Sequence, residues 1–219
     1  MPVEDLWSLY ALSRVNDTLL LSFQPAPVGA SDRRPEISLD EYTAFMTAIG
    51  LHPVREAGFS PFFHEIVKVE QHPDADAPVV VSGEYWPSLM LGNMMFSRAG
   101  VIVTSGREHI HKETAETSTM YWTFRRKTRP CYDLSVGWGS NSQWRTSFRR
   151  DYRIGRSFYF NVDGSNDLSL ASPGKDRDDL TPQERLELLL HRCFIRGADP
   201  HEALFPFDDA YRITTLETD

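Results

Sequence analysis

Cysteine is scarce in this chain of 219 residues, and long apolar runs are missing from it. Cys131 and Cys193 lie far apart and belong to no Cys-x-x-Cys pair, which is typical of two free thiols in a reducing compartment. No stretch approaches the roughly 18–20 apolar residues that a membrane span needs. Residues 1–5 lack the basic start of a signal peptide. We therefore expect a cytoplasmic protein that does not contact a membrane.

Basic residues are few outside one central segment. Residues 1–100 and 161–219 each hold 6 Lys or Arg against 13 Asp or Glu, whereas residues 101–160 hold 11 against 5. The net charge is −8, and so acidic a molecule should avoid nucleic acid, which is polyanionic. We expect the basic segment to pair with the acidic flanks, which leaves acidic groups free for a partner.

The familiar catalytic motifs are also missing. The His-Glu pairs at 64–65 and 201–202 have no second histidine one helical turn later, so neither completes the His-Glu-x-x-His of zinc hydrolases. No Gly-x-Ser-x-Gly occurs, and neither cysteine has a plausible local base. The lone Gly-Trp-Gly at 137–139 precedes a strand-like run, which favours a bend in a sheet over a phosphate cradle. We expect no catalytic residues.

One histidine pattern has the spacing of metal ligands. His109 and His111 form a His-x-His pair with three glutamates nearby, and residues i and i+2 of a strand share a face. Segment 106–113 contains hardly any apolar residues, however, and its better interpretation is a solvated polar hairpin. We expect neither a metal ion nor another cofactor.

The first of two predicted helices covers residues 38–49. Ser38 and Glu41 have the spacing of a capping box, and Gly50 is suited to the turn that ends the helix. The apolar stripe that we expect to be buried is Tyr42, Phe45, Met46 and Ile49.

The second predicted helix covers residues 182–196. Thr181 and Glu184 form another capping box around Pro182, and Gly197 should end the helix. Its expected buried face is Leu186, Leu189, Leu190 and Cys193.

Between the helices the sequence is typical of strands. Short runs of β-branched and aromatic residues lie at 79–81, 101–104, 120–124, 132–136, 144–148 and 157–162. A further strand is expected near 18–23, and the acidic loop 164–180 should be mobile. The fold class predicted is α+β: one domain, residues 1–219, with a central, mostly antiparallel sheet and the two helices beside it.

Aromatic residues are interleaved with the arginines of strands 121–156, as in proteins that stack bases and bind phosphates. A nucleic-acid or scaffold binding module is therefore one alternative function, and an enzyme of unrecognised type is another. The structural interpretation is that the arginines pair with Asp133, Asp151 and Asp163 inside a sheet. The net charge favours this interpretation.

Residues 134–164 read LSVGWGSNSQWRTSFRRDYRIGRSFYFNVDG. This stretch resembles the signature of the immunity protein 52 family, which occurs beside genes for bacterial polymorphic toxins and type VI secretion effectors. The matching segments are the Gly-Trp-Gly turn and residues 141–146, 148–152 and 161–164. The resemblance implies a non-enzymatic protein that binds and neutralises a cognate toxin, usually a nuclease, and it implies that this stretch is scaffold.

The toxin-binding surface is expected where acidic and aromatic residues share loops. The candidates are Asp74, Asp76, Glu84, Tyr85, Trp86, Asp176, Asp178, Asp179, Asp208 and Asp209. The alternative for each group is an ordinary solvated loop. The oligomeric state and the identity of the toxin stay open.

Overall fold

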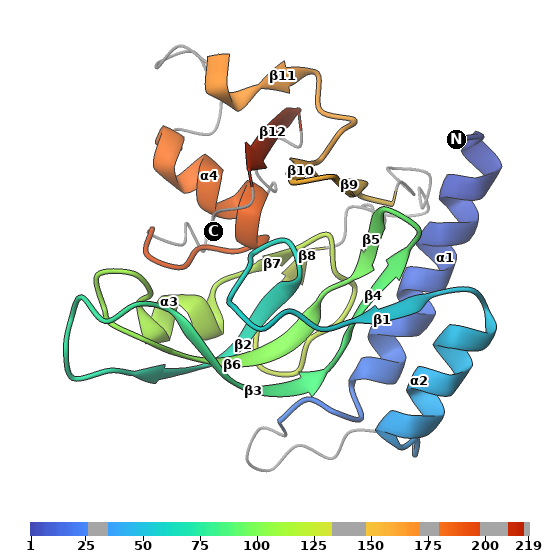
Figure 1. Cartoon of the computed structure of the whole chain (residues 1–219), viewed down its shortest axis with the longest axis horizontal. Helices are drawn as coiled ribbons and strands as arrows, with labels where there is room; N and C mark the ends of the chain where they lie inside the picture. The colour runs from blue at the N-terminus through green and yellow to red at the C-terminus, as the bar shows by residue number, and fades with distance from the viewer. Residues whose placement is uncertain (26–34, 133–147, 171–179, 198–209, 217–219) are drawn as a thin grey trace.

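A computed structural model describes residues 1–25, 35–132, 148–170, 180–197 and 210–216 and has an α+β fold (Figure 1). The helices are α1 (Val3–Leu20), α2 (Leu39–Ala48), α3 (Lys112–Thr117) and α4 (Pro182–His191), with a 3-10 turn at Leu168–Leu170. The strands are β1 (His52–Val54), β2 (His64–Gln71), β3 (Val80–Trp86), β4 (Ser88–Leu91), β5 (Met94–Ser97), β6 (Ala99–Ser105), β7 (Met120–Tyr121), β8 (Cys131–Tyr132), β9 (Asp151–Ile154), β10 (Ser157–Phe160), β11 (Asn166–Asp167) and β12 (Tyr211–Leu216). The predicted α+β class is confirmed.

The described strands form three sheets. Their orders are β1-β4-β5-β9-β10-β12-β11, then β2-β6-β3, and finally the pair β7-β8. Neighbouring strands are antiparallel except in the pairs β2–β6, β7–β8 and β11–β12. In Figure 1, α1 and α2 lie beside β1 and β4, whereas α3 lies against β2 at the opposite end of the molecule and α4 lies near β12.

Helix α2 begins where the sequence predicts. The Ser38 hydroxyl accepts from the backbone N–H of Glu41 at 3.2 Å, and the Glu41 carboxylate accepts from the backbone N–H of Ser38 at 2.9 Å. The Ser38 N–H, and then the Ser38 hydroxyl, which also donates to the Glu41 carboxylate at 2.7 Å, lower the pKa of Glu41. Gly50 follows the helix with a φ of 92°, a left-handed conformation that glycine adopts without strain.

The predicted stripe of α2 is only half buried. Tyr42 and Met46 are fully enclosed, whereas Phe45 and Ile49 are each 43% exposed. The four apolar residues cover a wider part of the helix surface than the part that contacts the rest of the protein. Only Tyr42 and Met46 therefore reach the core.

Helix α4 starts at the predicted capping box but is shorter than predicted. Arg192 has a left-handed φ of 63° and ends the helix, so the expected end at Gly197 is wrong. After this turn Cys193 and Phe194 enter the core in irregular backbone. The buried face is shifted too, and consists of Arg185, Glu187, Leu188 and Leu189.

Helix α1 replaces the strand expected near 18–23. Its apolar residues Val3, Trp7 and Val15 are about half exposed, whereas polar Asn16 and Asp17 are buried. Leu9 and Leu20 do face the core, but buried Asn16 and Asp17 interrupt this apolar face, which weakens the periodic signal in the sequence.

One other local expectation is wrong. Segment 106–113 is not a hairpin, because a turn leads directly into α3 and Ile110 is buried. Of the loop expected at 164–180, residues 171–179 lie outside the described ranges; before them, β11 pairs in parallel with β12 and the 3-10 turn follows it. Of the predicted strand at 144–148, only Phe148 is described, and it is buried.

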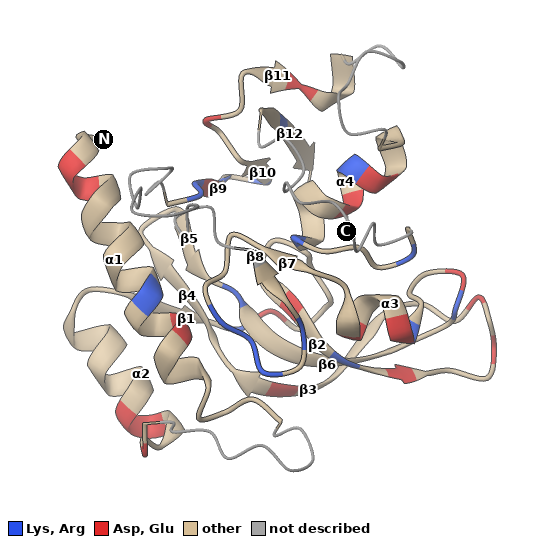
Figure 2. Ribbon diagram, turned by 180° about the vertical axis from the view of Figure 1, so that it is seen from behind, with Lys and Arg blue, Asp and Glu red and all other residues tan. Residues whose placement is uncertain are grey.

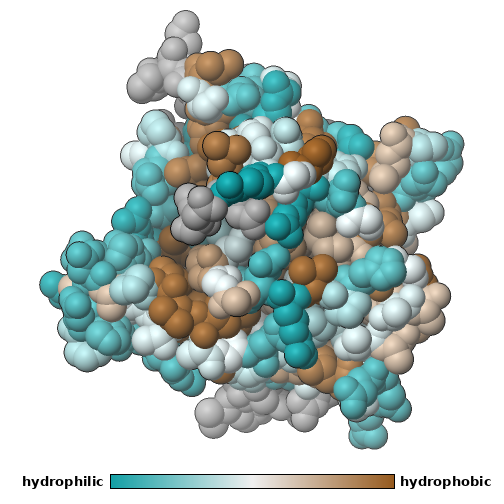
Figure 3. Space-filling view, viewed as in Figure 1, coloured by the Kyte–Doolittle hydropathy of each residue, from teal (hydrophilic) through white to brown (hydrophobic). Residues whose placement is uncertain are grey.

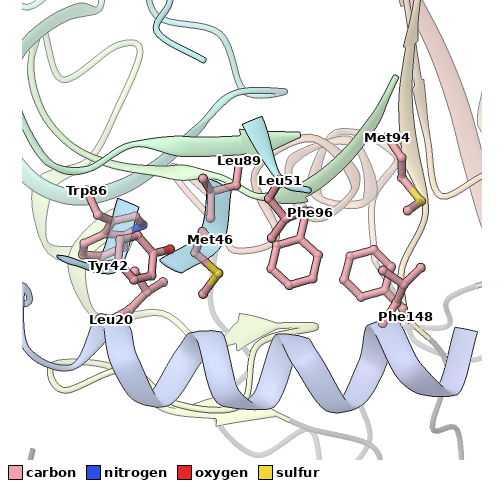
Figure 4. Packing of buried hydrophobic residues seen from close by; sticks show 10 residues of the cluster. Leu20, Tyr42, Met46, Leu51, Trp86, Leu89, Met94, Phe96 and Phe148 are labelled. Carbon is pink, nitrogen blue, oxygen red and sulfur yellow. The ribbon is translucent and has the colours of Figure 1, made fainter. Parts of the chain in front are cut away.

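The core above α1 contains Trp86 and the aromatic and sulfur side chains of α2, β5 and their neighbours (Figure 4). Trp86 Nε1 donates to the backbone oxygen of Arg98 at 2.9 Å, so its polar atom is satisfied. The ring lies directly on the backbone of Gly100, where an added Cβ would come within 2.4 Å of it. Glycine is needed at this position because the ring occupies the space of a side chain.

Adjacent residues of α2 offer a matched test of this core. Met46→Ala should lower the free energy of unfolding by about 2–5 kcal/mol, because it leaves a cavity in a closely packed cluster. Phe45→Ala, on the exposed side, should cost well under half as much. Urea unfolding followed by circular dichroism would measure both, and equal losses would contradict the described orientation of α2.

Candidate functional site

The interior of the molecule holds a fully buried carboxylate that is surrounded by arginines. Asp151 opens β9, and its Oδ1 accepts from Arg149 Nε at 2.9 Å and from the backbone N–H of Asn161 at 2.8 Å. Its Oδ2 accepts from Arg98 Nη2 at 3.2 Å and from Arg192 Nη2 at 3.1 Å. Burial alone would raise the pKa of Asp151, but the three arginines and the Asn161 N–H hold its pKa well below the usual range.

The same arginines bind the end of α4. Arg98 Nη1 donates to the backbone oxygen of Leu190 at 2.6 Å, and Arg149 donates to that of Leu189. The last carbonyls of a helix lack intrahelical donors and carry partial negative charge, which favours cations there. The cluster therefore couples β9, the β5–β6 connection and α4.

A second buried ion pair joins α1 to the three-stranded sheet. Arg126 binds both carboxylate oxygens of Glu65 in β2, at 2.6 and 2.9 Å, and Asp17 of α1 at 2.9 Å. Burial disfavours the ionised form of Glu65, but Arg126, then Arg129 and Arg192, lower its pKa. Arg192 also binds Asp151, so its charge acts on the carboxylates of both clusters.

Two arginines of the basic central segment, Arg126 and Arg149, are used in these pairs. The prediction that its arginines pair with Asp151 and Asp163 is confirmed, the second through Arg150. The side chains of Arg126 and Arg149 are only 6% and 1% exposed. These guanidinium groups hold the fold together and are out of reach of a phosphate backbone.

A pocket of about 300 Å³ lies between α4 and the connections of the three-stranded sheet. We call it the α4 pocket, and its lining includes Phe59, Val79, Ile110, Leu186, His191 and Arg196. Figure 3 shows apolar side chains gathered at the left centre of this face, with hydrophilic ones at the edge beside them. The walls are mostly apolar, as in pockets that receive an apolar group.

Two polar residues of α4 contribute to the same pocket. Glu187 is 3% exposed, and its Oε2 accepts the backbone N–H groups of residues 195, 196 and 197 at 2.8–3.0 Å. The His191 ring stacks on Phe59, with 6.0 Å between ring centroids and 8° between planes. Its Nδ1 is buried without a hydrogen-bond partner. Burial, then Arg98 and Arg196, lowers the pKa of His191 to about 3, so the ring is uncharged at neutral pH.

Asp74 and Asp76 lie in the turn between β2 and β3, beside the α4 pocket. Both are exposed, and Asp74 Oδ1 accepts from the backbone N–H of Asp76 at 3.1 Å. His109, which lines the pocket, lies 3.5 Å from Asp76 Oδ1. Figure 2 shows this connection projecting at one edge of the molecule, with its acidic residues in red. The structure thus brings a predicted acidic turn to the rim of an apolar pocket.

The other candidates of this group lie elsewhere. Glu84 and Tyr85 belong to β3 and not to a loop, and Glu84 is 3.6 Å from Arg55 Nε, beside an open hollow along α2. Trp86 is fully buried, so the expectation that it lies at a contact surface is wrong. Its indole is needed in the core, where it covers Gly100.

Several predicted residues lie outside the described part of the chain. They are Asp133, Arg145, Asp176, Asp178, Asp179, Asp208 and Asp209. Among the described residues, no three His, Cys, Asp or Glu side chains are grouped as metal ligands would be. The described helices include none that is both long enough and apolar enough to cross a bilayer.

The sequence did not predict a role for Glu187 or His191, because the buried face expected for α4 consisted of three leucines and Cys193. One signal was present: a charged residue stands at 187 inside the run 186–190, which is otherwise leucine. A charge among apolar residues is a candidate for a buried, hydrogen-bonded role.

Comparison with known proteins identifies no family for this chain. The chain matches no protein-family model, and no curated protein or solved structure is significantly similar to it.

Removing the central carboxylate should destabilise the fold strongly. Asp151→Asn should lower the free energy of unfolding by about 3–5 kcal/mol, because it leaves buried arginine charges without compensation. Asp163→Asn is the matched control, since it breaks an ion pair whose carboxylate is 49% exposed and should cost about 1 kcal/mol or less. Urea unfolding measures both, and an Asp151 variant as stable as the control would show that the cluster is not structural.

His64 and His191 should stay neutral below pH 6. Burial, then Arg98, lowers the pKa of His64 to about 4. An unfolded histidine, with a pKa of about 6.5, binds its proton at higher pH than these folded ones. Their contribution to the free energy of unfolding is therefore complete above about pH 6.5, and it is lost as the pH falls toward 4 for His64 and toward 3 for His191. We expect both imidazole NMR signals, assigned with His64→Gln and His191→Gln variants, to keep neutral-form shifts at pH 5. Titration midpoints near 6.5 would refute this.

Proposed function

We propose that this chain is an immunity protein, which binds a cognate secreted antibacterial toxin and neutralises it by direct contact. The stretch 134–164 resembles an immunity protein family whose usual targets are nucleases, and this resemblance names the class. The observation that carries the proposal is electrostatic. The arginines at 98, 126, 149 and 192 are bound to internal carboxylates, so the acidic surplus of a chain with net charge −8 is left for its surface.

The chemical groups of the interior support a binding role. Asp151 and Glu65 are each held by arginine, which keeps them ionised and makes them poor proton donors. Burial raises the pKa of the Cys131 and Cys193 thiols, which keeps them protonated and weakly nucleophilic. These groups stabilise a scaffold.

The surface around the α4 pocket supports a protein partner. Protein interfaces combine an apolar centre with a polar rim, and here an apolar pocket lies beside the exposed Asp74 and Asp76. A nuclease surface that grips nucleic acid is basic, so opposite charges would steer the two proteins together. Asp176, Asp178, Asp179, Asp208 and Asp209, outside the described residues, stay candidates for the same contact.

The test uses the toxin-domain protein encoded beside this gene, which we expect to be found there. Co-expression should restore growth to cells that produce the toxin, and the purified proteins should form a stable complex. Association should slow at least about tenfold between 0.1 and 1 M salt, where screening shortens from about 10 to about 3 Å, while dissociation changes little. Replacing Asp74 and Asp76 by Asn should flatten this salt dependence.

A matched control carries the same charge change elsewhere. Glu4→Gln with Asp5→Asn neutralises two exposed carboxylates at the start of α1, far from the β2–β3 turn in Figure 1, and should keep the salt dependence of the parent. Failure of the parent protein to form a complex or to protect cells would overturn the proposed function. Tight binding of single-stranded DNA or RNA 20-mers at 0.1 M salt would favour the nucleic-acid module instead.

A further inference from the structure

We infer that the α4 pocket is a socket for one aromatic side chain of the partner protein, presented on a loop next to a lysine or arginine. This inference rests on the proposed function, since it assigns the partner's contact residue. The pocket's size is the first argument. Its volume of about 300 Å³ lies at the lower end of the roughly 300–1,000 Å³ of small-molecule sites, so it suits a single large side chain.

The residues that line the α4 pocket favour an aromatic side chain over other groups. Val79, Ile110 and Leu186 supply apolar surface from three separate segments. The His191 ring, stacked on Phe59, adds a flat and uncharged wall. Aromatic rings pack well against such stacked faces, and buried aromatic anchors dominate the energy of many protein interfaces.

The charges inside the pocket are already balanced. Glu187 is satisfied by three backbone N–H groups and lies 3.7 Å from Arg196 Nε. Arg196 also donates to the backbone oxygen of Glu108 at 2.9 Å. The pocket therefore offers no strong unpaired charge for a charged side chain to bind, and an apolar ring costs the least to bury there.

The charged residues around the α4 pocket favour a basic residue next to the aromatic side chain that enters it. Asp74 and Asp76 are exposed in the turn beside the pocket, and Asp76 is held near it by the contact with His109. The side chain of Glu108 is 65% exposed and pairs with Arg107 at 3.7 Å. This leaves the rim with a surplus of negative charge, which is complementary to a lysine or arginine that flanks the inserted ring.

The probe is the peptide acetyl-Lys-Trp-Lys-amide, added to the full chain with ¹³C-labelled methyl groups. We expect saturable shifts of the methyl signals of Val79, Leu186 and Leu190, with a dissociation constant in the millimolar range. Acetyl-Lys-Ala-Lys-amide tests the ring and acetyl-Glu-Trp-Glu-amide tests the flanking charge, and each should bind at least about tenfold more weakly. Equal binding of all three peptides, or no shift at these methyls, would overturn the inference.

Two neighbouring valines provide matched variants. Val79→Trp fills the pocket and should abolish peptide binding, whereas Val80→Trp, at a residue that is 55% exposed and does not line the pocket, should leave it unchanged. Leu186→Trp is a second filling variant on α4, in case Val79→Trp does not fold by circular dichroism. Peptide binding that survives a folded filling variant would refute the socket.

The toxin experiment separates the two proposals. If the parent neutralises the toxin and a folded filling variant neutralises it equally well, the socket is wrong and the immunity function stands. If the peptide binds in the pocket but no toxin is neutralised, the socket stands as a peptide site and the immunity function fails.

Discussion

An ionised carboxylate in a protein interior must be compensated where it lies, and Asp151 is compensated by arginines from three separate segments. Arg98 comes from the β5–β6 connection, Arg149 precedes β9, and Arg192 ends α4. Arg98 and Arg149 also donate to carbonyls at the end of α4, which ties that end of the helix to the sheet. The position of the α4 pocket follows from this interaction, because α4 forms one wall of the pocket and the chain after Arg192 forms another.

The same arrangement determines the electrostatic character of the molecule. Arg126 and Arg149, two arginines of the basic central segment, are paired internally with Asp17, Glu65 and Asp151. The two clusters hold four arginines and three carboxylates, so the groups outside them carry the whole net charge of −8 and one negative charge more. One exposed acidic turn lies at the rim of an apolar pocket, and protein interfaces combine an apolar centre with a polar rim in the same way.

Local signals were enough for some elements and not for others. Both capping boxes mark real helix starts, because Ser38 and Thr181 need only residues three positions along the chain to make their bonds. The ends and faces of the helices were predicted less well. Arg192 pairs with Asp151, 41 positions away, and no window of neighbouring residues contains that information. Glu187 bonds residues 195–197, which come within reach only because the chain turns at Arg192. Of the candidate contact residues, Asp74 and Asp76 lie in an exposed turn, whereas Trp86 is in the core.

The sequence by itself determined the α+β class, the start of two helices and the pairing of basic residues with Asp151 and Asp163, since these depend on composition, short spacings and total charge. Only the tertiary structure decided that α1 is a helix, because polar Asn16 and Asp17 face inward to partners over 80 positions away. It also decided that a pocket forms beside the acidic turn. Burial and charge compensation are properties of groups that meet in space, and a chain read in order does not show which groups meet.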